Sequence, residues 1–441
     1  MTMPTIDSSA TPPATPTTDT TTSVRAAASS FLGTTVEWYD YFIYGTAAAL
    51  VFPKVFFNNL PDHMATLVSL ATFAVAFVLR PIGGAVFGHF GDKLGRKKML
   101  VITLLGMGIF TGLIGLLPTN AQIGSWAAVL LILCRVVQGF ALGGEWGGAA
   151  LMSVEHAPEG KRGFYGSTMQ AGVPAGLLAS AGVFGLVSML PDEDFYAWGW
   201  RIPFLIAFVL MAIGLYIRLA VEEPPAFQKV EQTGTKVEKP IVELFRHDTK
   251  KVVLLSLLQS AANVGYFLIT VYSLTYVTQT LDMPRTVATT GLMIGAAVDL
   301  VMQLVFGKLS DKFGRFKVYG FGILFLGLYA FPFYLLLDSR NEWLVILAFT
   351  LGLGIGHAST GSLHGVIYAE QFPTRYRYTG SSIAYQTAGI ISSAPTPIVA
   401  AALVSTFNNS DLVAWYVIGA AVISMIAVLM LKETYKDPID V

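Results

Sequence analysis

Two carboxylates and two tyrosines lie on one face of an apolar stretch near the start of the chain. Glu37 and Asp40 are three residues apart, and Tyr41 and Tyr44 follow about one turn further along the same helical face. An ionisable side chain that faces lipid costs about 2.5–3.5 kcal/mol, so both acids are expected to face the protein interior. Buried carboxylates of this kind can hold a proton or pair with a cation.

A guanidinium and an amide share a face of a second apolar stretch. Arg135 and Gln138 are three residues apart, and Glu145 follows seven residues later, close to the same stripe. Together with the first stretch, these groups offer a place where a proton and an organic anion compete or cooperate. The alternative is a structural ion pair that holds the two stretches together. Arg80, which precedes Pro81, allows either a second anion contact or packing with snorkelling toward the polar boundary.

Long apolar segments must position these residues. The 441 residues are 54% hydrophobic and only 13% charged, whereas a soluble domain usually carries about 25% charged residues. Apolar runs of about 20 residues match a hydrocarbon core roughly 30 Å thick. We therefore predict an all-α polytopic membrane protein with twelve transmembrane helices, at roughly 24–51, 64–89, 98–118, 123–150, 163–190, 203–221, 251–280, 286–309, 317–337, 343–368, 378–405 and 411–431.

The predicted spans fall into two groups of six. Residues 23–221 and 251–432 are expected to form two pseudo-symmetric six-helix bundles, joined by a polar cytoplasmic linker over 222–250. Residues 1–22 read as a disordered cytoplasmic tail, and 433–441 as a second cytoplasmic tail. With both termini on the cytoplasmic side, 22 of the 28 Lys and Arg residues lie on that side and four lie outside. The charge distribution therefore favours this orientation.

An internal repeat relates the two groups. A Gly-x-x-x-Asp-x-x-Gly-Arg loop with following lysines begins at Gly88 and recurs 219 residues later, beginning at Gly307. Both copies follow an even-numbered span, so the two halves are parallel repeats about an axis along the membrane normal. A solute pathway between the halves is expected from that symmetry.

The duplicated loop in a twelve-span chain resembles the signature of the major facilitator superfamily. More narrowly, the chain resembles its metabolite:proton symporter family in four stretches, which are Val36–Gly45, Leu79–Gly84, Arg135–Glu145 and Trp198–Pro203. The resemblance covers residues 28 to 432, and the first half looks most like the shikimate permeases. It implies that both loop copies form a cytoplasmic gate, with Gly88, Asp92, Gly95, Arg96, Lys97, Asp311, Gly314 and Arg315.

The second half carries fewer charges in its spans and more neutral polar groups. Asp299 is a lone acid at the repeat equivalent of Arg80, and it allows either a second proton site or a pairing role. His357 and His364 lie seven residues apart on one helical face. We expect a structural role for them, with a metal site or a proton relay as the alternatives.

These observations lead to one hypothesis for the site. Arg135 binds a substrate carboxylate, and the proton-coupling acids are Asp40, Glu145 and Glu37. The further substrate-binding candidates hydrogen-bond or stack on a polyhydroxylated ring, and they are Trp38, Tyr41, Tyr44, Arg80, Gln138, Gln170, Gln259, Asn263, Tyr266 and Gln386.

The predicted function is secondary active transport by alternating access, with protons as the coupling ion and no other cofactor or metal. The substrate implied by the resemblance is a small hydroxylated organic acid, shikimate first. The alternatives are another small carboxylate, an aromatic acid or an osmolyte as the substrate, or a uniporter or exporter of the same fold. We expect no enzyme activity, because no catalytic motif is present, and no nucleic-acid partner, because the net charge is zero. A multi-pass monomer in a bacterial inner membrane is the predicted form.

Overall fold

The computed structural model describes residues 20–94, 96–143, 146–155, 157–220, 240–373 and 376–437. These residues form helices and short connections, with no strand among them. The first half comprises α1 (Thr20–Leu50), α2 (Phe52–Val55), α3 (Asp62–Leu94), α4 (Arg96–Leu116), α5 (Asn120–Ile123), α6 (Trp126–Leu142), α7 (Trp146–Glu155), α8 (Arg162–Gln170), α9 (Gly172–Val187), α10 (Asp192–Ala197), the 3₁₀ turn η1 (Gly199–Arg201) and α11 (Ile202–Ala220).

The second half has more interruptions in its long helices. Its α-helices are α13 (Pro240–His247), α14 (Thr249–Leu258), α15 (Ser260–Phe267), α16 (Ser273–Thr275), α17 (Arg285–Phe313), α18 (Arg315–Asp338), α19 (Glu342–Leu351), α20 (Ala358–Gly361), α21 (His364–Gln371), α22 (Arg377–Ala388), α23 (Thr396–Phe407) and α24 (Asp411–Met430). Four π-helical segments connect some of them: η2 (Leu268–Tyr272), η3 (Tyr276–Thr280), η4 (Gly352–His357) and η6 (Gly389–Ser393).

The all-α membrane architecture predicted from the sequence is confirmed. Within the described residues, nine helical stretches are long and apolar enough to cross a membrane, and the shorter helices Val101–Leu116 and Trp126–Leu142 are also apolar. A helix rises about 1.5 Å per residue, so about 20 residues span the hydrocarbon core. Helix also occupies each of the twelve expected ranges, including α1. The count of twelve crossings, the side on which the termini lie and the domain boundaries stay predictions.

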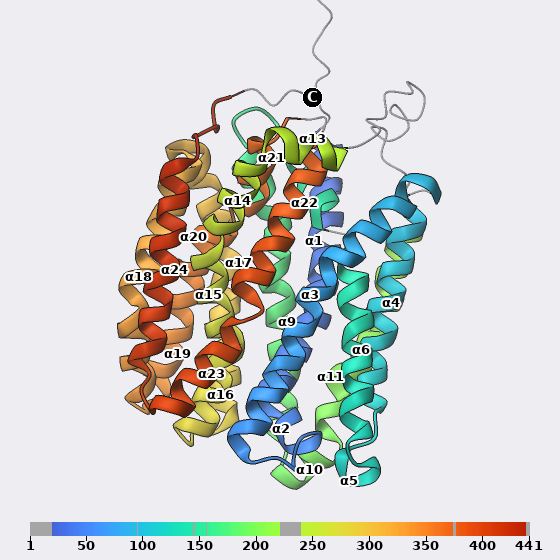
Figure 1. Ribbon diagram of the computed structural model, residues 1–441, viewed down its shortest axis with the longest axis vertical. Helices are drawn as coiled ribbons and strands as arrows, with labels where there is room; N and C mark the ends of the chain where they lie inside the picture. Colours follow the sequence, from blue (N-terminus) through green and yellow to red (C-terminus); the bar gives the residue numbers. More distant parts are fainter. Residues whose placement is uncertain are drawn as a thin grey trace, which may run out of the picture.

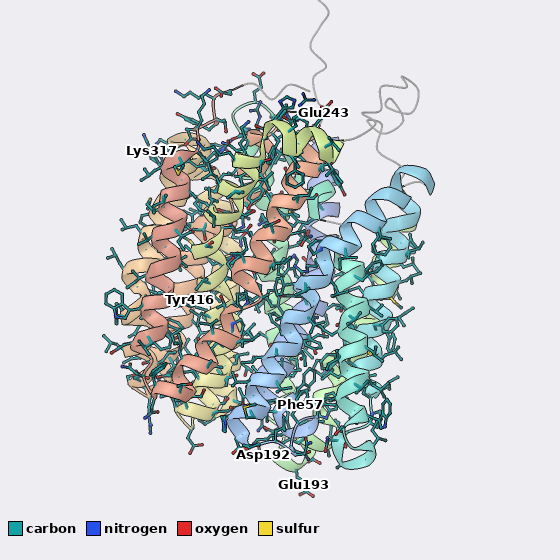
Figure 2. All side chains as sticks on the ribbon, viewed as in Figure 1. Phe57, Asp192, Glu193, Glu243, Lys317 and Tyr416 are labelled. Carbon is teal, nitrogen blue, oxygen red and sulfur yellow. The ribbon has the colours of Figure 1, made fainter. Side chains whose placement is uncertain are left out.

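The long helices run side by side along the long axis of the molecule (Figure 1). One end, here called the α13 end, carries α13 and the starts of α18 and α22, and the opposite α10 end carries α2, α5 and α10. Glu243 and Lys317 lie at the α13 end, whereas Asp192 and Glu193 lie at the α10 end (Figure 2). The linker predicted over 222–250 falls partly on α13, and residues 221–239 lie outside the described part of the chain.

The two halves pack against each other through a few helices. From the second half, α17 contacts α8 and α9, α21 contacts α7 and α8, and α23 contacts α3. Two interruptions lie next to prolines: α9 begins two residues before Pro174, and Pro395 lies between η6 and α23. Interrupted backbone of this kind is tolerated at membrane depth where it lines a cavity.

Candidate functional site

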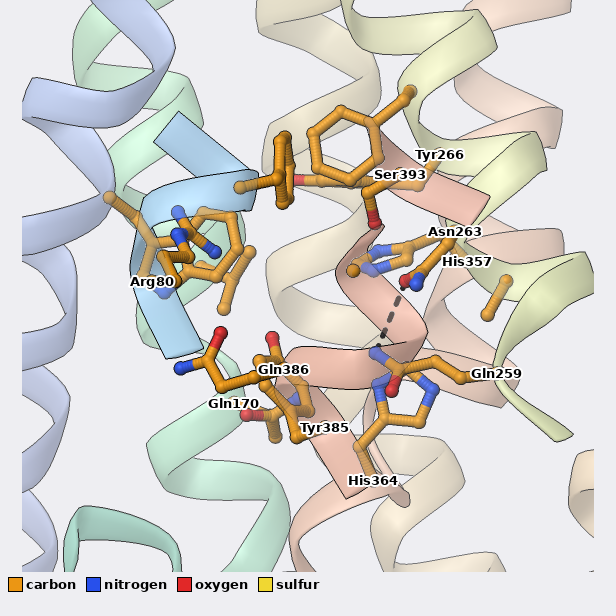
Figure 3. A pocket seen from close by; sticks show the side chains of 16 residues that line it. Arg80, Gln170, Gln259, Asn263, Tyr266, His357, His364, Tyr385, Gln386 and Ser393 are labelled. Atoms are coloured by element: carbon orange, nitrogen blue, oxygen red, sulfur yellow. Dashed lines mark hydrogen bonds between the residues drawn. The ribbon is translucent and has the colours of Figure 1, made fainter. Parts of the chain in front are cut away.

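A small cavity lies between the halves, where the interrupted helices meet. Its volume is about 30 Å³, which is room for water and much less than the roughly 300–1,000 Å³ of a typical ligand pocket. Residues of both halves line it: Trp38, Phe77, Arg80, Gln170, Val173, Gln259, Ala262, Asn263, Tyr266, Phe267, His357, His364, Tyr385, Gln386, Gly389 and Ser393. Arg80 and Gln170 face Gln259, Asn263 and the two histidines across it (Figure 3).

The structure separates the predicted substrate-binding residues into two groups. Seven of them line the cavity: Trp38, Arg80, Gln170, Gln259, Asn263, Tyr266 and Gln386. The other four lie outside the lining, in the first half: Tyr41, Tyr44, Arg135 and Gln138. The cavity therefore presents Arg80, and not Arg135, to a solute.

Close packing of α3 on α6 sets the place of Arg80. A Cβ on Gly143 would lie 1.9 Å from the backbone oxygen of Arg80, so only glycine permits this approach of the two backbones. The guanidinium lies 4.8 Å from the ring centre of Tyr41 and 4.7 Å from that of Phe77, in cation–π contact with both. Arg80 is buried, and its Nε finds no hydrogen-bond partner among the described residues.

Arg135 belongs to a hydrogen-bonded chain behind the cavity. Its Nη1 donates to Oε1 of Gln138 at 3.2 Å, and Nε2 of Gln138 donates to the Thr111 hydroxyl at 2.8 Å. The Thr111 hydroxyl donates to the Met107 carbonyl at 2.8 Å and lies beside the carboxylate of Asp40. The Arg135 guanidinium also lies 4.0 Å from the ring centre of Tyr44. Two neutral side chains, Gln138 and Thr111, thus separate Arg135 from Asp40.

The three predicted proton-coupling acids differ in their surroundings. Asp40 is buried, and its Oδ1 has no hydrogen-bond partner among the described residues. Glu37 is half-buried and interacts electrostatically with Tyr385 of the second half. Glu145 lies outside the described residues.

A row of hydrogen-bonded polar side chains forms the second-half wall of the cavity. The Tyr368 hydroxyl donates to Oε1 of Gln259 at 2.8 Å, and Nε2 of Gln259 donates to Oδ1 of Asn263 at 3.1 Å (Figure 3). Nδ2 of Asn263 donates to the Ser392 hydroxyl at 2.9 Å. These bonds fix which way each amide points, so the wall is pre-organised for polar groups of a ligand.

The sequence left the histidines and Asp299 with open roles, and the structure gives each a contact. Nδ1 of His357 lies 2.7 Å from Oδ2 of Asp299, and Nε2 of His364 lies 3.1 Å from the Tyr319 hydroxyl. Both histidines line the cavity, although neither stood among the predicted substrate-binding residues. Their seven-residue spacing on one face was the available signal.

The second copy of the duplicated loop joins the halves at the α13 end. Asp311 accepts hydrogen bonds from the backbone N–H groups of Gly163 at 2.8 Å and Phe164 at 2.9 Å, in the first turn of α8. Arg315 holds Asp311 at 2.8 Å and Glu370 at 3.1 Å. Gly314, between the two loop residues, has a φ of 100°, which favours glycine.

The first copy of the loop lies at the end of α3 and the start of α4. Gly95 lies outside the described residues, as do the side chains of Asp92, Arg96 and Lys97 and the surroundings of Gly88.

Contacts between the halves also close the α10 end. Arg285 pairs with Asp192 and donates to the Leu190 carbonyl at 2.7 Å, and the Thr66 hydroxyl donates to Oε1 of Gln279 at 2.9 Å. With both ends joined and a central cavity of about 30 Å³, the structure has an occluded arrangement.

Solved structures of xylose transporters share this fold. A D-xylose-proton symporter superposes with a TM-score of 0.72 at 19% identity, covering 96% of this chain and 100% of that one. A partially occluded, inward-open xylose transporter from E. coli gives the same TM-score at 17% identity, covering 95% of this chain and 100% of that one. At these identities the likeness concerns the fold.

Sequence comparisons carry the relationship further. The chain is 42% identical to the shikimate transporter of Escherichia coli (strain K12) over 421 residues, 93% of this chain and 95% of that protein. It is 43% identical to the inner membrane metabolite transport protein YhjE of the same strain over 416 residues, 93% of this chain and 94% of that one. The proline/betaine transporter of that strain is 36% identical over 430 residues, 94% of this chain and 84% of that one.

The family model of the Major Facilitator Superfamily matches residues 30–397 and 300–439. The relatives that match over most of their length are transporters and not enzymes. The chain therefore belongs to the Major Facilitator Superfamily, as a multi-pass membrane transporter.

Proposed function

We propose that this chain is a proton-coupled symporter that takes up a small hydroxylated organic acid, with shikimate as the first candidate. Support comes from the relative of 42% identity, a shikimate transporter, and from the proton symporters that share the fold. The protein would act as a monomer in a bacterial inner membrane, since each chain holds both halves of the cavity.

The observation that carries this proposal is a set of buried polar atoms that lack partners on the cavity wall. Arg80 Nε, Gln170 Oε1 and the Tyr266 hydroxyl line the cavity and find no hydrogen bond among the described residues. An unsatisfied buried polar group costs about 1–3 kcal/mol, and a ligand that pairs with all three would remove that cost. A carboxylate with ring hydroxyls supplies both the acceptor and the donors that these atoms require.

The charge of the cavity favours an anion. Arg80 supplies a permanent positive charge, and no Asp or Glu is among the described lining residues. In this proposal Arg80 binds the substrate carboxylate, and Arg135 holds Tyr41 and Tyr44 in place behind it. Asp40, Glu37 and Glu145 remain the first-half candidates for proton coupling, and the unpaired, buried Oδ1 of Asp40 is a place to hold a proton.

A zwitterionic osmolyte is the second candidate, because a proline/betaine transporter is 36% identical to this chain. The aromatic rings of Trp38, Tyr266 and Tyr385 line the cavity and can contact a quaternary ammonium group. Competition separates the two candidates, since glycine betaine would displace shikimate only if both use this cavity.

Uptake of radiolabelled shikimate into proteoliposomes with an inward proton gradient tests the function. We expect accumulation that a protonophore abolishes and that close carboxylate analogues, but not glycine betaine, reduce. The variant Arg80→Gln should raise the half-saturating concentration about 10- to 100-fold, because it loses a charge-assisted hydrogen bond of about 1.5–3 kcal/mol. The control Arg340→Gln changes an exposed arginine at the α10 end. No uptake of shikimate under the gradient would reject the substrate, and uptake indifferent to the protonophore would reject symport.

A further inference from the structure

The second half holds a buried acid–imidazole pair directly behind the cavity wall. Asp299 on α17 is fully buried, with Oδ2 placed 2.7 Å from Nδ1 of His357 and Oδ1 accepting a 3.3 Å hydrogen bond from Nε2 of Gln303. Both carboxylate oxygens therefore have a partner. An acid within a membrane span is tolerated when it is paired inside the protein, and spans that carry such acids often mark ion or proton pathways.

His357 stands between Asp299 and the cavity. The imidazole belongs to the cavity lining, whereas Asp299 does not. On the cavity side, the imidazole stacks on Tyr266, with ring centres 3.8 Å apart and planes inclined by 27°. The acid thus holds the imidazole at its Nδ1 edge and the Tyr266 ring stacks on its face, so the orientation of the imidazole is fixed.

The second imidazole nitrogen lies close to a contact between the halves. A Cβ added to Gly361 would lie 2.6 Å from Nε2 of His357, so this glycine leaves room at that nitrogen. The carbonyl of Gly361 accepts a 2.9 Å hydrogen bond from Nε2 of Gln170 in the first half. A movement that separates Gln170 from Gly361 would break this bond and change the surroundings of Nε2.

The local helix geometry singles out His357 over His364. His357 is the last residue of the π-helical segment η4, and single π turns occur preferentially at functional sites. His364 instead lies in α21 and contacts the neutral Tyr319 hydroxyl at 3.1 Å. Of the two histidines, His357 is the one with a carboxylate that can stabilise its charged form.

We propose that Asp299 and His357 form the site at which the second half carries the coupling proton. This inference rests on the proposed function as a proton symporter. In the unloaded pair, neutral His357 donates Nδ1–H to the Asp299 carboxylate. Loading adds one proton from cavity water to Nε2, and the imidazolium stays paired with the carboxylate. Release returns that proton from Nε2 to water on the other side, with no other bond made or broken.

Other titratable groups face the pair from several elements. They are Tyr266 on α15, His364 on α21, Tyr319 on α18, Tyr385 on α22, Tyr41 on α1 and Arg80 on α3. Phenols ordinarily keep their proton and guanidinium its charge at physiological pH, whereas imidazole ordinarily changes charge between pH 5 and 8. Geometry therefore places the coupling proton on His357, which has the carboxylate partner, and not on His364.

Transport by Asp299→Asn and His357→Gln tests the pair. Asp299→Asn should exchange shikimate across proteoliposome membranes within a few-fold of wild type, and both variants should fail to concentrate it above equilibrium under a proton gradient. Substrate-driven proton entry, read with an internal pH dye, should be lost. The matched control is Asp338→Asn, since that carboxylate accepts a 2.6 Å hydrogen bond from Tyr276 and does not line the cavity.

Two results separate failure of the pair from failure of the function. Wild-type protein that accumulates no shikimate rejects the proposed function, whereas variants that accumulate it as wild type does overturn the pair alone. A second measurement needs no substrate: nitrogen NMR of ¹⁵N-histidine-labelled wild type, with His357→Gln used to assign the signal. We expect Nε2 of His357 to gain a proton between pH 5 and 8 with Nδ1 remaining protonated. A neutral His357 throughout that range overturns the proposal, even where a variant fails to fold.

Discussion

The two ends of the molecule are closed by contacts of different strength. At the α13 end, Asp311 accepts two backbone hydrogen bonds from α8, and the buried side chains of Arg315 and Glu370 brace it. At the α10 end, the ion pair between halves joins Arg285 to an Asp192 side chain that is 73% exposed. Charge-assisted bonds away from water contribute more than exposed ion pairs, which contribute about 0–1 kcal/mol. The difference predicts that the α10 end opens at lower cost than the α13 end.

Removal of Asp311 should break this comparison most strongly. Asp311→Ala removes two charge-assisted hydrogen bonds between the halves, so we expect a loss of about 3 kcal/mol from closure of the α13 end and a roughly 100-fold shift toward opening there. Distances between spin labels on Glu159→Cys and Lys312→Cys, exposed sites in different halves, report this opening. An unchanged distance distribution would contradict the assignment of Asp311 as the main contact.

A smaller effect is expected from the second ion pair at the α13 end. Arg377 and Glu155 lie 3.1 Å apart across the halves, and the Glu155 side chain is 31% exposed. We expect Glu155→Gln to weaken closure by about 1 kcal/mol, a few-fold change in the open population. The same spin-label pair measures it, with Glu159 and Lys312 labelled as before. A shift as large as that of Asp311→Ala would show that the contribution of these contacts to closure does not follow their burial.

Loss of the ion pair at the α10 end should have a smaller effect still. Asp192→Asn leaves Arg285 its 2.7 Å hydrogen bond to the Leu190 carbonyl and its cation–π contact with Phe195. We expect at most about a two-fold change in opening at this end, since exposed pairs contribute little. Labels on Glu193→Cys and Glu342→Cys follow it, and high salt should mimic the variant in the wild type.

The smallest effect concerns pH. The hydrogen bond from Arg285 lowers the pKa of Asp192 from its usual value of 3.8. A lowered pKa means that the contact is complete above 3.8 and is lost only as the pH falls through the lower folded-state value. The ion pair between Arg285 and Asp192 should therefore stay formed between pH 5 and 8, and Asp192→Asn should leave any change of the α10-end distances with pH in that range as it is in the wild type. A pH response that is lost in Asp192→Asn would show that Asp192 titrates in this range.

The sequence by itself determined the membrane class, the family and the chemistry available in the spans. Composition and apolar runs of about 20 residues leave few structures other than membrane-spanning helices. The repeat between the loops at Gly88 and Gly307 indicated two parallel halves, and the motifs carried the resemblance to the superfamily that the comparisons confirmed. Helical spacing also showed which side chains share a face, such as His357 and His364.

Only the tertiary structure decided which polar residues meet. The sequence favoured Arg135 as the residue that binds a substrate carboxylate, but the packing of α3 on α6 brings Arg80 to the cavity and leaves Arg135 behind it. Asp299 and His357 are 58 residues apart, and their contact depends on how α17 lies against η4. The physical reason is that helical periodicity fixes the direction of a side chain within its own helix, whereas the neighbour it meets is set by the packing of all the helices together.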